Sequence, residues 1–310
     1  MKKTSKTIVF FGNERLATGV TTTAPVLKAL IEAGYHVAAV VSHYEHGKSR
    51  NVRELEVQKV AEAHDIPVLL PDKPAHIVDQ LKAYGAGAGV LVAYGKLVPQ
   101  SVIDIFPHGI INLHPSLLPT HRGPTPIEGT ILDGDNRTGV SIMQLVQKMD
   151  AGPVYGQSEI DLTGNETKQD LAAQLAEVGR AMMIELLPGI LEGSIVAIPQ
   201  DESRASYDAL LSKADGSLDW NKPASRLERE IRAFQGWPQS RTEIAELPVI
   251  ITKARLSDQK LAPGEWSVQD ASLLVGCTTG SLIIEWLKPA GKAEMTAQAF
   301  LAGYGNRLGR

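Results

Sequence analysis

Hydrophobic residues in roughly the first two hundred positions are grouped into short, almost unbroken runs, which amphipathic stretches separate. Runs without polar alternation are typical of strands that are buried on both faces. The alternation of such strands with helices predicts an α/β domain with a parallel, doubly wound sheet. We expect strands at 6–12, 36–41, 67–71, 89–95, 109–115 and 137–146, and helices at 17–32, 52–65, 75–84 and 167–191.

The pattern changes after about residue 195. One further helix is expected at 223–235, and the rest of the chain consists of short apolar runs that Gly, Pro or Asp residues separate. This is the pattern of a small β-barrel of the size of an OB-like fold. We therefore expect a catalytic α/β domain over 1–195, a linker over 196–207 and an OB-like domain over 208–310.

Composition excludes several classes of protein. The 310 residues are 43% hydrophobic and 21% charged, as in an ordinary globular protein, and the apolar runs are too short to cross a bilayer. Cys277 is the only cysteine, and the first residues lack the long apolar stretch of a signal peptide, so we expect a cytoplasmic protein. With a net charge of −4, an RNA partner would have to be bound by a local cationic patch.

Two polar residues interrupt the apolar strand at 109–115. Asn112 and His114 alternate, so their side chains lie on the same face, and Pro115 ends the strand at once. Asp150 follows the next long strand, and the Ala-Gly-Pro after it allows close approach of the backbone. Ligands of parallel sheets bind beyond the carboxyl ends of the strands, which makes these three residues candidates for a site. The alternative is that His114 is a hydrogen-bonded core residue.

The chemistry of this trio favours acyl transfer. An amide and an imidazolium can donate hydrogen bonds to an oxyanion, and a carboxylate can pair with the imidazolium or help to remove a proton. We find no pairing of Ser or Cys with His that would indicate an enzyme nucleophile, so the acceptor itself is expected to attack. The motifs GAGAG (85–89) and HYEH (43–46) have the wrong spacing or context for a nucleotide loop or a metal site, and we expect no metal.

The stretch from Asn112 to Gln157, which reads NLHPSLLPTHRGPTPIEGTILDGDNRTGVSIMQLVQKMDAGPVYGQ, resembles the signature region of 10-formyltetrahydrofolate-dependent formyltransferases. The resemblance implies a Rossmann-like domain followed by an OB-like domain. It also implies that Asn112, His114 and Asp150 are catalytic. The residues that it assigns to the folate site lie in the loop SLLP and at the strand end LVAYG: Leu91, Val92, Tyr94, Gly95, Ser116, Leu117, Leu118 and Pro119.

Two later stretches, 206–240 and 289–309, resemble the branch of this family that acts on methionyl initiator tRNA. This narrower resemblance implies transfer of a formyl group from the folate N10 to the α-amino group of methionine on the tRNA, by a monomer. Members of the family carry basic residues in the loop after the second strand. Here the cations of that loop and of the smaller domain, taken as candidates for tRNA binding, are Lys48, Arg50, Arg53, Arg229, Arg232, Lys253 and Arg255.

Other acceptors and activities stay open. The same chemistry could serve an amino-sugar nucleotide, a glycinamide ribonucleotide or another small amine. Water as acceptor would make the protein a formate-releasing hydrolase. A non-catalytic folate- or RNA-binding module is a further alternative, although simple binding does not require Asp150.

Overall fold

The computed structural model describes residues 6–43 and 55–304. The chain divides into two compact units, each assembled from three stretches of sequence. The first unit contains Met1–Ile127, Asn136–Leu162 and Gln169–Ala209. The second unit contains Glu128–Asp135, Thr163–Lys168 and Leu210–Arg310.

The first unit is built on a seven-stranded sheet of order β3-β2-β1-β4-β5-β6-β7. Strands β1 to β5 are parallel, whereas β6 runs antiparallel to β5 and β7 antiparallel to β6. Sequence analysis missed β7. The bounds are β1 Thr7–Gly12, β2 His36–Val41, β3 Val68–Leu69, β4 Ala88–Val92, β5 Ile110–His114, β6 Arg137–Gln144 and β7 Val154–Asp161.

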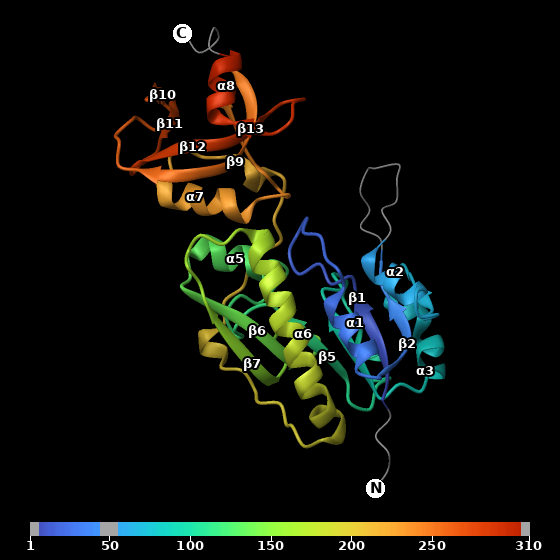
Figure 1. Cartoon of the computed structure of the whole chain (residues 1–310). Helices are drawn as coiled ribbons and strands as arrows, with labels where there is room; N and C mark the ends of the chain where they lie inside the picture. The colour runs from blue at the N-terminus through green and yellow to red at the C-terminus, as the bar shows by residue number, and fades with distance from the viewer. Residues whose placement is uncertain (1–5, 44–54, 305–310) are drawn as a thin grey trace. The chain divides into compact units, whose positions relative to one another are not determined.

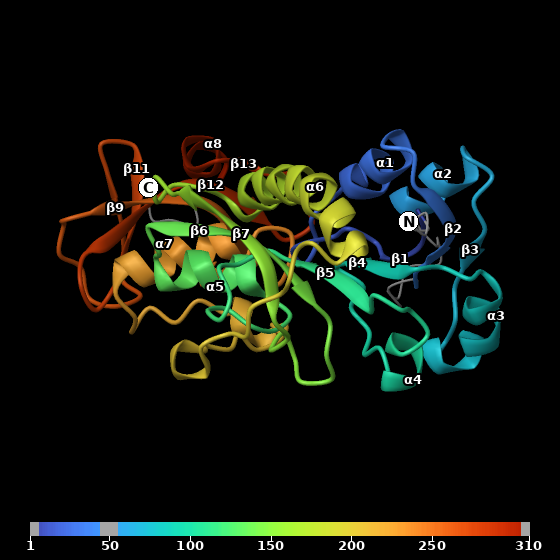
Figure 2. The same cartoon turned by 90° about the horizontal axis from the view of Figure 1, so that it is seen from below.

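Helices cover both faces of this sheet (Figure 1 and Figure 2). In Figure 2, α1, α2 and α6 lie on one face, and α3 and α4 on the other, as expected of a doubly wound sheet. Helix α6 packs closely on β5, because a Cβ atom at Gly179 would lie 2.4 Å from the Leu113 side chain. The bounds are α1 Pro25–Glu32, α2 Glu56–Glu62, η1 Pro74–Ile77, α3 Val78–Ala83, α4 Gln100–Ile103, α5 Pro126–Asp133, α6 Lys168–Glu192 and η2 Glu202–Arg204.

The first helix is shorter than predicted. It begins at Pro25 and not near residue 17, because the β-branched run 20–23 favours helix poorly and Ala24 is left-handed with φ 53°. The first turn is held by a distant side chain, since the buried Glu14 carboxylate accepts hydrogen bonds from the backbone N–H of Val26 (2.9 Å) and Leu27 (2.8 Å). Sequence position alone did not indicate this cap.

The second unit contains an antiparallel sheet of order β10-β11-β12-β9-β8, with β13 paired to β12. Helix α7 packs Leu227 and Ile231 into the core of this unit. The fold class predicted from the sequence, a Rossmann-like α/β sheet followed by a separate small β domain, is confirmed. The bounds are η3 Ala214–Gly216, α7 Ala224–Ala233, β8 Ser240–Ile244, β9 Leu247–Ser257, β10 Trp266–Gln269, β11 Ser272–Gly276, β12 Ser281–Pro289, β13 Met295–Thr296 and α8 Ala297–Tyr304.

Earlier stretches of the chain complete the second unit. Lys168 is fully buried, and its Nζ donates to the carbonyl oxygen of Trp237 (2.7 Å) and lies 3.5 Å from the buried Glu128 carboxylate. Burial lowers the pKa of Lys168, which the negative charge of Glu128 partly offsets. Arg226 of α7 donates to the carbonyl oxygen of Leu132 (2.7 Å). These contacts hold 128–135 and 163–168 to the last hundred or so residues.

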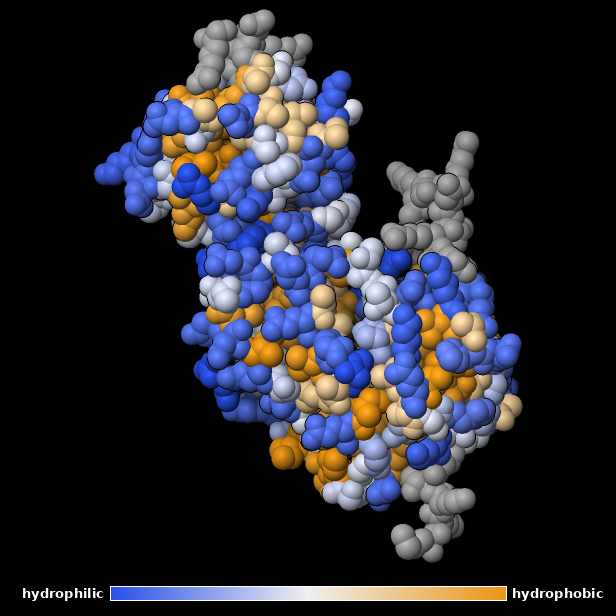
Figure 3. Space-filling model, in the orientation of Figure 1, coloured by the Kyte–Doolittle hydropathy of each residue, from blue (hydrophilic) through white to orange (hydrophobic). Residues whose placement is uncertain are grey.

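The surface in Figure 3 is mainly hydrophilic on both units, and hydrophobic residues show through in smaller areas. Within residues 6–43 and 55–304, no helix combines the length and apolar character that a membrane span needs.

Candidate active site

Asn112 and His114 lie on β5, between its parallel neighbour β4 and its antiparallel neighbour β6. Both residues are buried, with 5% and 4% of their surface exposed. In the described part of the chain, no residue is hydrogen-bonded to the Asn112 side chain. Among the described residues, the enclosed side-chain atoms that lack a partner do not include those of Asn112, so its amide is open at the surface of the site and can bind a ligand there.

The orientation of the His114 ring is fixed from one side. Its Nε2 lies 2.9 Å from the backbone carbonyl oxygen of His121. A carbonyl oxygen only accepts hydrogen bonds, so Nε2 must carry the proton. The other ring nitrogen, Nδ1, is therefore left for another partner, and it lies 3.8 Å from Oδ1 of Asp150.

Asp150 follows β6, as the sequence indicated, and has the left-handed φ of 48°. Its Oδ1 lies 3.8 Å from Nδ1 of His114, while its Oδ2 accepts a hydrogen bond from the backbone N–H of Gly123 (2.8 Å). The expected close backbone approach occurs at Gly152, where a Cβ atom would lie 1.8 Å from the Gln144 carbonyl oxygen. The three predicted catalytic residues thus come together at one edge of the sheet.

The loop after β5, which contains the predicted folate residues Ser116 to Pro119, is held by β6 and β7. The hydroxyl of Ser141 donates to the Ser116 carbonyl oxygen (2.7 Å) and accepts from the Leu118 N–H (3.1 Å). The Gln157 amide donates to the Leu118 carbonyl oxygen (2.8 Å). Ser116 donates in turn to the carbonyl oxygen of Thr120 (2.7 Å), so the loop has a defined conformation.

The other predicted folate segment lies at the end of the neighbouring strand β4. Leu91 and Val92 pair with Asn112 and Leu113, which brings both segments to the same edge of the sheet. The side chains of Leu91, Val92 and Tyr94 are nevertheless buried. Tyr94 packs edge-on against Phe11 and His43, and burial raises its pKa to about 12. These side chains build the wall behind the site, and Gly95 is the exposed member of the segment.

A further set of residues near the site, 200–209, was not predicted from the sequence and includes most of the predicted linker. Arg122 is fully buried, and its guanidinium donates to Gln200, Glu202 and Tyr207. Arg122 and Lys148 lower the pKa of Glu202 to about 2. Asp208 pairs with Nδ1 of the His121 side chain (2.9 Å). This segment therefore fixes the residues that contact His114 and Asp150.

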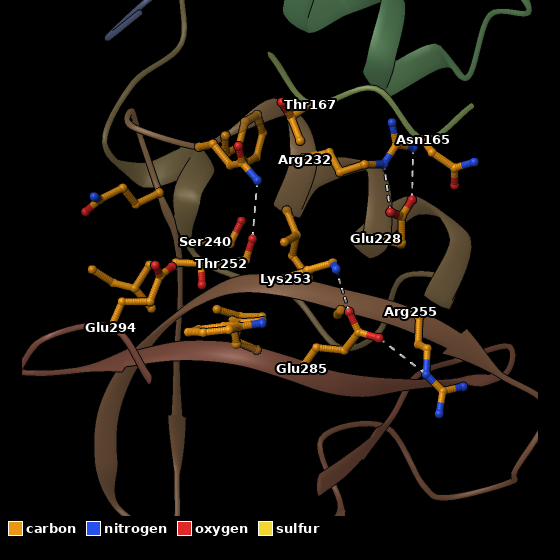
Figure 4. A pocket seen from close by; sticks show the side chains of 18 of the residues that line it. Asn165, Thr167, Glu228, Arg232, Ser240, Thr252, Lys253, Arg255, Glu285 and Glu294 are labelled. Carbon is orange, nitrogen blue, oxygen red and sulfur yellow. Dashed lines mark hydrogen bonds and ion pairs between the residues drawn. The ribbon is translucent and has the colours of Figure 1, made fainter. Parts of the chain in front are cut away.

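The predicted RNA-binding cations that the structure describes all belong to the second unit. Lys48, Arg50 and Arg53 lie outside the described residues. Lys253 and Arg255 on β9 line a groove of about 1120 Å³ in the second unit, where both pair with Glu285 of β12 (Figure 4). Their side chains are 65% and 58% exposed.

The two predicted RNA-binding arginines on α7, Arg229 and Arg232, form hydrogen bonds within the second unit. Arg229 donates to the carbonyl oxygen of Asp133 (3.0 Å). Arg232 donates to Glu228 and to the carbonyl oxygen of Glu166, and only 13% of its side chain is exposed. The side chains of Arg229 and Arg232 therefore help to hold the second unit together, in addition to any other contacts they make.

Acidic, histidine and cysteine side chains do not gather into a cluster of three or more that could hold a metal ion anywhere in 6–43 or 55–304.

Comparison with known families identifies the class of protein. The formyl transferase family model matches residues 7–187, and the model of the formyl transferase C-terminal domain matches residues 210–305. The chain belongs to the formyl transferase family, and it is an enzyme of the formyltransferase class.

The curated relatives that it matches carry a more particular name. A methionyl-tRNA formyltransferase of Chloroflexus aurantiacus is 36% identical over 304 residues, which cover 96% of each chain. Enzymes of the same name from Roseiflexus castenholzii and Methylococcus capsulatus are each 35% identical, covering 97% of this chain and 98% and 99% of theirs.

Solved structures share the fold at low sequence identity. HypX from Aquifex aeolicus, in complex with tetrahydrofolic acid, has a TM-score of 0.66 at 17% identity and covers 96% of this chain and 47% of its own. An N-formyltransferase from Helicobacter canadensis, solved with folinic acid and dTDP-3-aminofucose, has a TM-score of 0.66 at 16% identity and covers 90% and 97%.

Proposed function

We propose that this formyltransferase moves the formyl group of 10-formyltetrahydrofolate onto the α-amino group of methionine carried by initiator tRNA. The observation that supports the chemistry is that the buried Asn112 and His114 lie on one face of β5, and that Nδ1 of His114 lies 3.8 Å from Oδ1 of the partly buried Asp150. The choice of acceptor is supported by full-length relatives that bear the name methionyl-tRNA formyltransferase.

The reaction requires the protein to stabilise an oxyanion and to transfer a proton. The amine nitrogen attacks the formyl carbon, whose carbonyl oxygen becomes an oxyanion, and the bond from that carbon to N10 then breaks. Asn112 and the Nδ1–H of protonated His114 donate hydrogen bonds to the oxyanion, a contribution typically of about 10²–10³ in rate per donor. Asp150 accepts the proton that the amine loses, and that proton returns to N10. The α-amino pKa of roughly 8 leaves a useful neutral fraction at pH 7.

The geometry of His114 and Asp150 supports these roles. Nε2 of His114 is hydrogen-bonded to the carbonyl oxygen of His121, so only Nδ1 of the ring is available to the substrate. The gap of 3.8 Å between Nδ1 and Asp150 Oδ1 is longer than a hydrogen bond, so the proton on Nδ1 is not already bonded to the carboxylate. His114 can therefore direct this N–H to an oxyanion.

The folate donor is proposed to bind beside the loop from Ser116 to Pro119 and the end of β4. Hydrogen bonds from Ser141 and Gln157 fix this loop, which favours a preformed site. The exposed Gly95 offers backbone to the ligand, and the buried Leu91, Val92 and Tyr94 support it from behind.

The tRNA is proposed to contact the groove of the second unit. Lys253 and Arg255 provide exposed cations there, and Trp286, which is 40% exposed, provides an aromatic face for stacking. Phosphates would compete with Glu285 for both cations, so binding should depend strongly on salt. Lys48, Arg50 and Arg53 remain candidates of the same kind.

An amino-sugar nucleotide is the second candidate acceptor, because the fold is shared with the Helicobacter canadensis enzyme solved with dTDP-3-aminofucose. The experiment supplies labelled formyl donor with methionyl initiator tRNA, uncharged tRNA or an amino-sugar nucleotide. Label on the aminoacyl group supports the proposal. Transfer only to the sugar amine, or release of formate alone, would contradict it.

The cytoplasmic location and the monomeric state remain predictions, to be checked by fractionation and by light scattering.

A further inference from the structure

Gln200 joins the buried arginine to the proposed catalytic carboxylate residue. Its Oε1 accepts hydrogen bonds from Arg122 Nε (3.1 Å) and Nη2 (2.8 Å). Its Nε2 donates to the backbone carbonyl oxygens of Asp150 (2.7 Å) and Gly152 (2.6 Å). The amide thus has both of its N–H groups and both acceptor positions of its oxygen in use, which is the full capacity of a glutamine.

Asp150 needs such support because its backbone is left-handed. A φ of 48° is sterically unfavourable for most non-glycine residues and persists only where the surroundings hold it. The hydrogen bonds from Gln200 hold the peptide on the carbonyl side of Asp150. The bond from the Gly123 N–H holds its side chain at the other end.

The two supports are connected to one another. Gly123 directly follows Arg122, and Arg122 is held by Gln200. Arg122, Gln200, Asp150 and Gly123 therefore form a closed ring of hydrogen bonds and covalent links. A shift of the Gln200 amide would move both the Asp150 backbone and the loop that binds its carboxylate.

We propose that Gln200 is a positioning residue of the reaction, which acts through Asp150 by fixing the direction of its carboxylate toward Nδ1 of His114. This inference rests on the function proposed above. In the sequence, the segment that carries Gln200 has the pattern of a linker. In the structure, the Gln200 amide contributes to the catalytic geometry by holding Asp150. A misplacement of about 1 Å can cost on the order of a hundredfold in rate.

The Gln200→Glu variant separates positioning from simple structural support. The carboxylate keeps the acceptors for Arg122, and so keeps the contact with the buried guanidinium, but it has no N–H for Asp150 or Gly152. We expect a fall of about ten- to a hundredfold in kcat, with little change in either Michaelis constant and with folding retained. The control is Asp201→Asn, on the adjacent exposed residue, whose side chain contacts Ser203 of its own segment. Its kcat should match that of the parent.

The negative charge that Gln200→Glu introduces calls for a second comparison. If Gln200 acts through Asp150, the substitution should have no further effect in an Asp150→Ala background, because coupled residues are not additive. A loss of the same size in both backgrounds would contradict the inference. Should Gln200→Glu fail to fold, Gln200→Asn, which keeps the amide but is one carbon shorter, is expected to show the same fall in kcat.

The outcomes distinguish this inference from the proposed function. Unchanged kcat in folded Gln200→Glu, together with an inactive Asp150→Ala, would overturn the positioning role alone. Full activity of Asp150→Ala would overturn the proposed trio and this inference with it.

Discussion

His114 and Asp150 face each other across 3.8 Å, between Nδ1 and Oδ1, and each is bound at its far atom by the same short loop. Nε2 of the histidine donates to the carbonyl oxygen of His121, and Oδ2 of the aspartate accepts from the N–H of Gly123. The loop thus holds the Asp150 carboxylate and the His114 imidazole far enough apart that Oδ1 and Nδ1 remain available to a third group.

The first prediction concerns this pair. His114→Ala and Asp150→Ala should each lower the rate of formyl transfer by about two orders of magnitude or more, which is the loss typical of an oxyanion donor or a general base. The measurement is single-turnover transfer of labelled formyl groups. His64→Ala, at an exposed position, is the control. Near-parental rates in the folded variants would remove the pair from the mechanism.

The second prediction concerns Glu14, whose pKa burial raises from 4.5 to about 7. The native state therefore binds this proton more tightly than the unfolded state, so the stabilisation is fully present below pH 4.5 and is lost as the pH rises through about 7. The difference corresponds to roughly 3 kcal/mol between pH 4 and pH 8.

Urea unfolding across that pH range measures the effect. Glu14→Gln should remove this part of the decline, whereas Glu32→Gln, at an exposed position of helix α1, should keep it. Parallel pH curves for the parent and Glu14→Gln would show that Glu14 titrates normally.

The third prediction concerns the buried pair in the second unit. Lys168→Ala leaves the Glu128 carboxylate without its counter-charge, so we expect a loss of about 3–5 kcal/mol in the free energy of unfolding. The double variant Lys168→Met with Glu128→Gln should lose less, because no charge is then buried alone. Arg137→Ala, which breaks an exposed pair with Glu159, should change it by less than about 1 kcal/mol. A similarly small change for Lys168→Ala would mean that water reaches Glu128.

The fourth prediction concerns the groove of the second unit. Replacement of Lys253 and Arg255 by Ala should raise the Michaelis constant for methionyl-tRNA and reduce its dependence on salt, because fewer counterions are then released. Lys260→Ala, at an exposed position that does not line the groove, should leave both unchanged. If the double variant keeps the parental salt slope, the RNA contacts lie elsewhere, and the cations at 48, 50 and 53 become the next test.

Periodicity was sufficient to predict most strands of the first unit, because buried parallel strands leave an unbroken apolar run, as at β2 and β4. It failed where the local sequence was outweighed by distant contacts. β7 alternates exposed and partly buried residues and gains its place by pairing with β6. The start of α1 is set by the distant carboxylate of Glu14, which periodicity does not register.

The candidate site shows the same contrast between features that local sequence determines and features that distant contacts determine. Asn112, His114 and Asp150 could be proposed as candidates because each interrupts or follows a strand at the end of the sheet where ligands of parallel sheets bind. His121, Gln200 and Asp208 could not, because they act through a backbone carbonyl, a bridging amide and a pairing between residues 87 positions apart. Such links are formed by the folded chain and have no fixed spacing in the sequence.

The discontinuous make-up of the second unit bears on how the chain is synthesised. Proteins leave the ribosome from the N-terminus, so 128–135 and 163–168 emerge long before the residues after 210 that complete their unit. Until Trp237 arrives, Lys168 lacks the carbonyl oxygen that binds it in the finished protein. A nascent chain halted before that point should expose these two stretches to proteases, and a fragment that begins at 210 should lack the buried pair of Glu128 and Lys168.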